Sequence, residues 1–410
     1  MQKAADTNSS DVMMRPRPAA AIAIFALMAC SAAIFARSQP DIAGENGLWL
    51  SVTDDSVVVH WLTAIPAAGS LAVATPTDTA RFSTPAGQAH RAVLSPAPAG
   101  PVTLQYGSAD ALHTTFVDLT PVPRRAAILA AVDSLYIVGD THGDMAALTT
   151  GLTAAGLIDE GLAWTGGRRH LVFAGDLTDR GPDVLRLLWF VYRLEREAAE
   201  AGGAVHVLLG NHEIMVMLSD LRYVHPKEAQ VAELHGASYQ QLFDVRESFL
   251  GRWLASKPAV VRTGDVLITH GGVTTETARL PLQAFDDTLA QYMGEDLFHR
   301  WADTTFHPAL DSASYQVRED FFWGPRSVFW HREYVQSDTL ATELDQVLTE
   351  WGASILVVGH TAVPQIEARY DGRLIAAHTR RYGAELLLLA RAPAGWERYR
   401  ITADGPPERF

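Results

Sequence analysis

The sequence predicts an α/β core in which strands alternate with helices, preceded by a smaller all-β region. From about residue 126 onward, apolar stretches of strand length alternate with amphipathic stretches of helix length, a pattern typical of layered α/β domains. Between residues 41 and 121, short β-branched runs are separated by proline and glycine. The chain of 410 residues is long enough for two or three domains.

Composition excludes several classes of function. Lys and Arg total 33 while Asp and Glu total 47, so the formal net charge is −14. Because nucleic-acid-binding surfaces are normally basic, we expect no nucleic-acid partner. Cys30 is the only cysteine, which excludes a disulfide scaffold, an iron–sulfur cluster and a cysteine-based zinc site within the chain. Any metal ion must therefore be bound by His, Asp, Asn or Glu.

The first 40 residues have the pattern of a targeting segment. Residues 19–36 carry no charge, and arginines flank them on both sides. A basic start followed by an apolar stretch is typical of an export signal, and the stretch just reaches the length of a membrane-spanning helix. Leu27-Met28-Ala29-Cys30 resembles a bacterial lipoprotein processing site. We expect residues 1–40 to be a cleaved signal peptide or an N-terminal membrane anchor, and the remainder to be periplasmic or anchored facing the periplasm; a buried core helix is the alternative.

Residues 41–121 are predicted to form a small β-sandwich. The expected strands are residues 48–52, 56–63, 70–74, 102–106 and 114–119. The run from Val57 to Thr63, with Trp61 at its centre, resembles the tryptophan-bearing strand of fibronectin type III-like domains. The stretch from Thr120 to Arg125 is the expected linker to the α/β core.

The α/β core is predicted to span residues 126–405. Its expected buried strands are residues 135–138, 171–174, 205–209, 266–269 and 355–358. Its expected helices are residues 145–155, 182–199, 233–254, 282–301 and 339–351. Each buried strand ends in a cluster of Gly, Asp, Asn or His, and ligands of α/β sheets gather at the carboxyl ends of strands. These clusters therefore mark the candidate site.

Five polar clusters follow the apolar strands. They are Gly139–Asp144, Gly175–Gly181, Gly210–Glu213, Thr269–Gly272 and Val358–Thr361. Together they supply carboxylate, amide and imidazole ligands without a thiolate. Two divalent cations about 3.5–4 Å apart need such a mixed set with one bridging carboxylate. The co-occurrence of all five clusters, rather than any single one, predicts a two-metal site.

The clusters resemble the Gly-Asp-x-His-Gly, Gly-Asp-x-x-Asp-Arg-Gly, Gly-Asn-His-Glu, His-Gly-Gly and Gly-His motifs of the metallophosphoesterase, or calcineurin-like, superfamily. Asp179-Arg180-Gly181 resembles the phosphoprotein phosphatase branch of that superfamily. Residues 220–224 and 324–334 further resemble the Shewanella-like phosphatases. The resemblance spans about residues 134–380, and it implies a core of two packed sheets flanked by helices.

The resemblance also implies a set of metal ligands for two divalent or trivalent ions, with manganese as the first expectation and iron or zinc as alternatives. The matching residues are Asp140 and His142 for the first metal, the bridging Asp176 for both, and Asn211, His270 and His360 for the second.

Four further positions match residues that act on the phosphate group. His212 matches the general acid that protonates the leaving oxygen, and Asp179 matches the acidic partner that orients this histidine. Arg180 matches the arginine that clamps the phosphate. Arg332 is the expected second arginine, with Arg326 as the alternative. The resemblance implies direct attack on phosphorus by a metal-activated water, without a covalent intermediate.

The predicted function is hydrolysis of phosphate monoesters, on phosphoserine, phosphothreonine or phosphotyrosine of proteins or on small phosphate esters. One alternative is a phosphodiesterase or a nucleotide or dinucleotide hydrolase that uses the same site. Another is a surface-binding protein with a vestigial metal site. Purple acid phosphatases carry a tyrosine three residues after the bridging aspartate; because Asp179 stands there, we expect no purple chromophore.

Other polar and aromatic residues are weaker candidates. His378 could approach the metals, and His225 and His235 could line a substrate groove, but a structural role is the default for each. Three aromatic residues could stack on an aromatic phosphate, with core packing as the default: Trp323, Trp330 and Tyr334.

Overall fold

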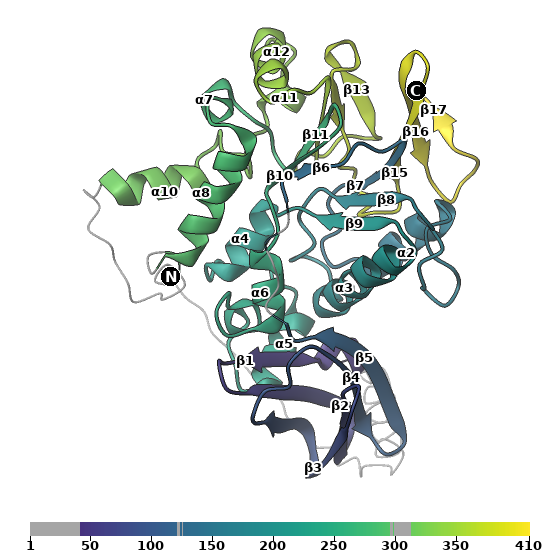
Figure 1. Cartoon of the computed structure of the whole chain (residues 1–410), viewed down its shortest axis with the longest axis vertical. Helices are drawn as coiled ribbons and strands as arrows, with labels where there is room; N and C mark the ends of the chain where they lie inside the picture. The colour runs from purple at the N-terminus through teal and green to yellow at the C-terminus, as the bar shows by residue number, and fades with distance from the viewer. Residues whose placement is uncertain (1–41, 121–123, 125, 296–297, 299–312) are drawn as a thin grey trace, which may run out of the picture. The chain divides into compact units, whose positions relative to one another are not determined.

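The computed structural model describes residues 42–120, 124, 126–295, 298 and 313–410 (Figure 1). The expected leader, residues 1–40, and most of the expected linker lie outside the described residues. Within the described ranges the strands form three sheets, one of five strands and two of six. No helix in these ranges is long and apolar enough to cross a membrane. Residues 42–410 belong to one compact unit.

The N-terminal region is all-β, as the sequence predicts. Its strands are β1 (Trp49–Val52), β2 (Val57–Ala74), β3 (Thr79–Leu94), β4 (Pro101–Ser108) and β5 (Ala111–Asp118). The two strands expected at 56–63 and 70–74 are one long strand, β2, and β3 was not predicted. Pro66 and Pro85 are two of the prolines expected to separate strands, and they lie where the β2–β3 register shifts, between Leu62 and Gly69 of β2. Proline is tolerated at such bulges because no ladder hydrogen bond is needed there.

The five N-terminal strands form one hydrogen-bonded sheet rather than two separate ones. The Trp61 indole nitrogen donates to Gly107 O at 3.2 Å, although Gly107 pairs with Ser70. The stretch from Trp61 to Ser70 would span about 30 Å if fully extended, so β2 must bend between them. The sheet therefore folds over one buried core that includes Trp61, Leu71 and Leu104.

The N-terminal region is hydrogen-bonded to helices of the α/β core, through residues just before β1 and through β1 itself. The Trp189 indole of α3 (Val184–Glu200) donates to Leu48 O at 3.0 Å. The Arg252 guanidinium of α6 (Phe249–Ala255) donates to Val52 O at 3.0 Å. The Lys227 ammonium of α5 (Pro226–His235) donates to Asn46 Oδ1 at 3.1 Å. These contacts are buried or part-buried, so the β region packs directly on the core.

Two six-stranded sheets form the α/β core (Figure 1). The first core sheet contains β7 (Ser134–Val138), β8 (His170–Phe173), β9 (Ala204–Val207), β15 (Leu386–Ala392), β16 (Gly395–Ile401) and β17 (Glu408–Arg409). The second contains β6 (Ile128–Leu129), β10 (Val260–Thr263), β11 (Val266–Thr269), β12 (Ile355–Val358), β13 (Glu367–Arg369) and β14 (Leu374–Ala376). Ile137 and Val172 of the first sheet share one buried cluster with Ile268 and Val357 of the second. The predicted core of two packed sheets is confirmed.

Four predicted helices correspond to α2 (Met145–Ala154), α3, α8 (Leu282–Gly294) and α12 (Ala341–Glu350), and α8 ends before the predicted residue 301. Among the described residues, four further helices were not predicted: α4 (Asn211–Met217), α7 (Thr275–Ala278), α10 (Ala313–Trp323) and α11 (Glu333–Gln336). The prediction of a single helix at residues 233–254 is wrong. Gly236, at φ 71°, ends α5 in the left-handed conformation. The Ser248 hydroxyl then caps a new helix, α6, by accepting from Gly251 N.

Parallel strands place the polar clusters at common edges. In the first core sheet, β7, β8 and β9 run parallel, and in the second, β11, β12 and β14 run parallel. The carboxyl ends of each parallel set therefore meet at one edge of their sheet. Four of the predicted clusters directly follow β7, β8, β11 and β12, and the fifth begins α4 after β9.

The first turn of α3 is held by a buried carboxylate from α5. Glu228 Oε1 accepts from Val184 N at 3.1 Å, and Glu228 is fully buried. Burial raises its pKa from 4.5 to about 8. Between these two values the folded chain holds one proton more than the unfolded chain does. The resulting stability is fully present below pH 4.5 and is lost as the pH rises through 8.

We expect Glu228→Gln, which keeps the Oε1 acceptor but cannot ionise, to remove this pH dependence. In urea unfolding the variant should match the wild type near pH 5 and exceed it by about 2–4 kcal/mol at pH 8. Glu233→Gln, at an exposed position of the same helix, is the control and should follow the wild type at both pH values. Equal pH slopes for Glu228→Gln and wild type would contradict the assignment.

Candidate metal centre

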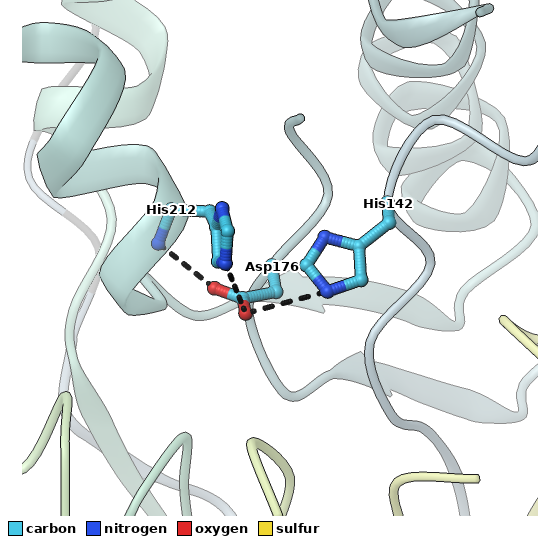
Figure 2. Close-up of side chains that lie close together, drawn as sticks. All are labelled: His142, Asp176 and His212. Carbon is cyan, nitrogen blue, oxygen red and sulfur yellow. Dashed lines mark hydrogen bonds and ion pairs between the residues drawn. The ribbon is translucent and has the colours of Figure 1, made fainter. Parts of the chain in front are cut away.

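Asp176 stands at the centre of the candidate site. It follows β8, is almost fully buried, and directs its two carboxylate oxygens to different groups of ligands. Oδ1 lies 3.2 Å from His270 Nε2, and Oδ2 lies 3.7 Å from His142 Nε2. His212 N donates to Oδ1 at 2.9 Å and its ring Nε2 is 3.8 Å from Oδ2 (Figure 2). This is the placement expected of a carboxylate shared by two metal ions.

The second ligand group contains two imidazoles, one amide and one carboxylate. Around His270 Nε2 lie Asn211 Oδ1 at 2.9 Å and His360 Nδ1 at 3.1 Å, besides Asp176 Oδ1. The carbonyl of Ala174, 2.8 Å from His270 Nδ1, can only accept, so Nδ1 carries a proton. Burial disfavours the charged ring, but Asp176 outweighs it and raises the pKa of His270 to about 9, so a metal ion at Nε2 would displace a proton from this ring. Burial, helped by His270, lowers the pKa of His360 to about 2, which keeps this ring neutral. Neutral imidazole is the form that binds metals.

The first ligand group is built from the turn after β7. His142 Nε2 lies 3.7 Å from both Asp140 Oδ2 and Asp176 Oδ2. His142 Nδ1 is 3.0 Å from Thr178 O and must donate to it, which leaves Nε2 free to bind a cation. Asp140 Oδ1 accepts from His360 N at 2.9 Å, so Oδ2 faces the group. Among the described residues, His142, Asp176 and His212 offer ligand atoms within 4.8 Å of one another, and so do Asp176, His270 and His360. Two such groups sharing Asp176 fit two metal ions, with Asp140 beside the first group.

His212 and Asp179 form a buried pair beside the metal ligands. His212 Nδ1 is 2.7 Å from Asp179 Oδ2, and Asp179 has no exposed surface. Burial disfavours the charged ring, but Asp176 and the hydrogen bond to Asp179 outweigh it and raise the pKa of His212. Arg180 Nη2 lies 3.2 Å from His212 Nε2. The histidine is thus held in a position and protonation state suited to donating a proton.

The arginines predicted to bind phosphate have different surroundings. Arg180 is exposed, and its guanidinium lies over the Tyr223 ring at 5.3 Å from the ring centroid. The half-buried Arg332 donates to His360 O at 3.2 Å, which places it beside the second ligand group. Arg326, the alternative, is paired with Glu333 and Glu343 at 3.0 and 2.7 Å. Among the described residues, Arg180 and Arg332 are the predicted arginines that border the site.

Two of the weaker histidine candidates lie elsewhere. His225 caps α5, accepting from Lys227 N at 3.2 Å. His235 Nε2 is 3.1 Å from Gly47 O, at the contact with the N-terminal region. His378, by contrast, lies 3.4 Å from Asp140 Oδ2. Tyr334 is buried and donates to Val273 O at 2.8 Å, which is a core contact.

The aromatic pair Trp323 and Trp330 extends toward the second ligand group. Their ring centroids are 5.9 Å apart, and the Trp330 ring is 5.8 Å from the His360 ring. The Trp330 indole nitrogen donates to Phe322 O at 2.9 Å, so its orientation is fixed by the helix α10.

Glu213 has a role that the sequence analysis missed, although its motif was recognised. Its carboxylate is completely buried and accepts five hydrogen bonds. The donors are Asp176 N, Leu177 N, Thr178 N, Thr178 Oγ1 and Gly210 N, at 2.7–3.0 Å. Glu213 thereby ties the turn that carries Asp176 to the start of α4. The Gly-Asn-His-Glu spacing was the available signal, because a glutamate three residues after an N-cap can accept from the cap's N–H.

Backbone strain is concentrated at the same place. Five site residues other than glycine have positive φ, between 47° and 68°: His142, Asp176, Asp179, Arg180 and His360. This left-handed conformation costs about 1–3 kcal/mol at each such residue and is retained where surrounding structure enforces it. No local sequence signal identified these positions.

The chain belongs to the calcineurin-like phosphoesterase family. The model of this family matches residues 134–364, which are more than half of the chain. The chain is 44% identical over 95 residues to Shewanella-like protein phosphatase 2 of Arabidopsis thaliana, which covers 23% of this chain and 24% of that protein. It is 27% identical over 236 residues to Shewanella-like protein phosphatase 1 of Plasmodium berghei, covering 56% and 61%. The predicted resemblance to Shewanella-like phosphatases is confirmed.

Two further comparisons bear on function. The crystal structure of the cold-active protein-tyrosine phosphatase of a psychrophilic Shewanella species matches with a TM-score of 0.61 and 27% identity, covering 76% of this chain and 96% of that one. The Bacillus subtilis bis(5'-nucleosyl)-tetraphosphatase PrpE is 30% identical over 146 residues, covering 34% and 58%. The chain therefore spans less than two thirds of each of the three curated relatives named here.

We expect Glu213→Gln to destabilise the protein and weaken metal binding together. The amide NH₂ must face backbone N–H donors, which leaves buried groups unpaired and costs about 2–3 kcal/mol. Chemical unfolding and metal analysis of the dialysed protein measure the two effects. Glu385→Gln is the matched control, because the buried Glu385 accepts from Ile366 N and the amide oxygen can replace that contact. If Glu213→Gln kept its full metal content, this would contradict the role of Glu213 in holding the turn that carries Asp176 against the start of α4.

Proposed function

We propose that this protein is a phosphatase that hydrolyses phosphate monoesters at a centre of two metal ions. The observation that carries the proposal is the His212–Asp179 pair, because a buried histidine whose Nδ1 is held by a carboxylate beside the metal ligands is placed to protonate a leaving oxygen through Nε2. The similarity to Shewanella-like phosphatases and to a protein-tyrosine phosphatase supports phosphorylated substrates.

The two ligand groups indicate which residues would hold each metal ion and what the ions would supply to phosphate hydrolysis. Asp140, His142 and Asp176 would hold one ion, and Asp176, Asn211, His270 and His360 the other. Two bound ions would supply an activated water and neutralise charge on the phosphoryl oxygens. A mixed set of imidazole, carboxylate and amide donors suits manganese, our first expectation, as well as iron or zinc.

The chain's own residues account for binding and proton transfer. Arg180 borders the His212 ring, and Arg332 borders the second ligand group, so two guanidinium forks are available to phosphoryl oxygens. Protonated His212 would donate from Nδ1 to Asp179 and offer the transferable proton from Nε2. The Arg180 guanidinium beside Nε2 can only donate, so it would turn from the ring to the phosphoryl oxygens when His212 is protonated. A departing alkoxide or phenoxide would take up that proton from Nε2.

The expected compartment of the protein favours some phosphate monoesters over others as substrates. The pattern of residues 1–40 supports export of this chain to the periplasm, either free or membrane-anchored. An exported phosphatase meets small phosphate esters and exported phosphoproteins rather than cytoplasmic ones. Both substrate classes fit the proposed chemistry.

A dinucleotide hydrolase is the second candidate, favoured by the similarity to PrpE. A phosphodiester or the inner phosphates of a dinucleoside polyphosphate carry less charge per phosphorus than a monoester does. Paired arginines and two metal ions favour the dianionic monoester. Comparing kcat/KM for an aryl phosphate, a bis-aryl phosphate and diadenosine tetraphosphate separates the candidates, and preference for either of the last two would replace our proposal.

We expect Asp176→Asn to abolish metal-dependent turnover of an aryl phosphate in a protein that starts near residue 40. Loss of the shared carboxylate removes the bridge between the ions and several kcal/mol of transition-state stabilisation, so kcat should fall by at least about 10³-fold. Asp287→Asn, at an exposed position of α8, is the control and should retain turnover. A metal-loaded wild type that turns over none of these substrates would favour the surface-binding alternative instead.

We expect the effect of His212→Asn to depend on the leaving group. Turnover of an alkyl phosphate should fall by about 10²–10⁴-fold, because a poor leaving group needs the proton. Turnover of p-nitrophenyl phosphate, whose leaving group is stable as an anion, should fall much less. A steeper dependence of log kcat on leaving-group pKa in the variant than in the wild type is the measurement. Parallel plots would show that His212 is not the general acid.

A further inference from the structure

We propose that His378 is a fourth protein ligand of the first metal ion. The inference rests on the two-metal centre of the proposed function and goes beyond the ligand set that the family motifs supply. Those motifs give the second ion four protein ligands but the first only three, namely Asp140, His142 and Asp176. His378 comes from outside all five clusters, after β14 of the second core sheet.

The distances around Asp140 Oδ2 fit a shared cation. The Nε2 atom of His378 lies 3.4 Å from Asp140 Oδ2, and the Nε2 atom of His142 lies 3.7 Å from the same oxygen. Two ligand atoms that each bind one ion at about 2.0–2.1 Å in a tetrahedral arrangement are about 3.4 Å apart. A direct hydrogen bond between an imidazole and a carboxylate in the same site has a shorter separation, because His212 Nδ1 lies only 2.7 Å from Asp179 Oδ2.

The fold holds His378 firmly at this position. Val363 N donates to His378 O at 3.0 Å, which fixes the backbone. The turn after β7 approaches so closely that a Cβ on Gly139 would lie 2.8 Å from the His378 Cα. Tyr382 packs against both rings, with centroids 5.7 Å from His142 and 6.2 Å from His378. The His378 side chain is therefore confined beside Asp140.

Burial of His378 also needs an explanation. The residue is only 5% exposed, and its Nδ1 is buried without a hydrogen-bond partner among the described residues. Burying an imidazole that makes no short hydrogen bond is unfavourable. Binding a metal through Nε2 would offset part of the cost of burying the ring, although Nδ1 would keep its proton without a partner among the described residues. It would also give both ions matched sets of two imidazoles and two oxygen ligands.

The test is metal binding by His378→Ala, which does not depend on turnover. Calorimetric titration of the metal-free protein with Zn²⁺ and metal analysis after dialysis report the two sites separately. We expect the second ion to bind as in the wild type and the first to bind at least about 100-fold more weakly, because even partners beyond the ligands contribute 10–100-fold. Added imidazole should enter the vacated position and restore the first ion.

Tyr382→Phe is the matched control, since it keeps the aromatic packing against both histidines and should retain both ions at wild-type affinity. Two ions bound to His378→Ala with unchanged affinity would overturn the proposal. Loss of both ions that imidazole does not reverse would also overturn it, because it would show that His378 supports the fold rather than one site. Failure of the phosphatase proposal would leave these binding results unchanged, so the two proposals fail separately.

Discussion

The candidate site depends on one buried carboxylate. Glu213 binds the backbone of the turn after β8 and the start of α4 at once, through five hydrogen bonds. That turn carries Asp176 and Asp179, and α4 begins with Asn211 and His212. Asp176, Asn211 and His212 are therefore positioned relative to one another by a residue that is not itself one of the proposed ligands. Because a buried acceptor without donors would be costly, the turn cannot relax without disrupting the core.

This tie explains how strained ligands are retained. Asp176 and His142 have left-handed backbones, yet Thr141 N and His142 N both donate to Asp176 O at 3.0 and 2.9 Å. The two turns thus hold each other in conformations that neither would adopt alone. The backbone hydrogen bonds that hold these ligand groups come from the fold itself, so folding supplies part of the free energy that a flexible site would need for ordering.

The two core sheets contribute unequal parts that are joined by direct contacts. His270, from the second sheet, places Nδ1 against Ala174 O of the first. His360 N, also from the second sheet, donates to Asp140 Oδ1 of the first. Each contact fixes a ligand through a group that does not itself face the metal, which orients the ring or carboxylate that does. The packing of one sheet on the other is therefore what brings the two halves of the centre into register.

The sequence by itself determined the ligand types and the α/β class, because both are local. Each motif follows its own strand, and strand or helix period is visible within a dozen residues. It did not determine which residues outside the five motif clusters join the site. His378 reaches Asp140 and His235 does not, because convergence depends on strand register and sheet packing between residues far apart in the chain. The continuity of β2 through Pro66 and the bonds from Glu213 to the turn after β8 were likewise decided by contacts between distant residues. The division at Gly236, by contrast, follows from local caps, namely Gly236 at the end of α5 and Ser248 at the start of α6.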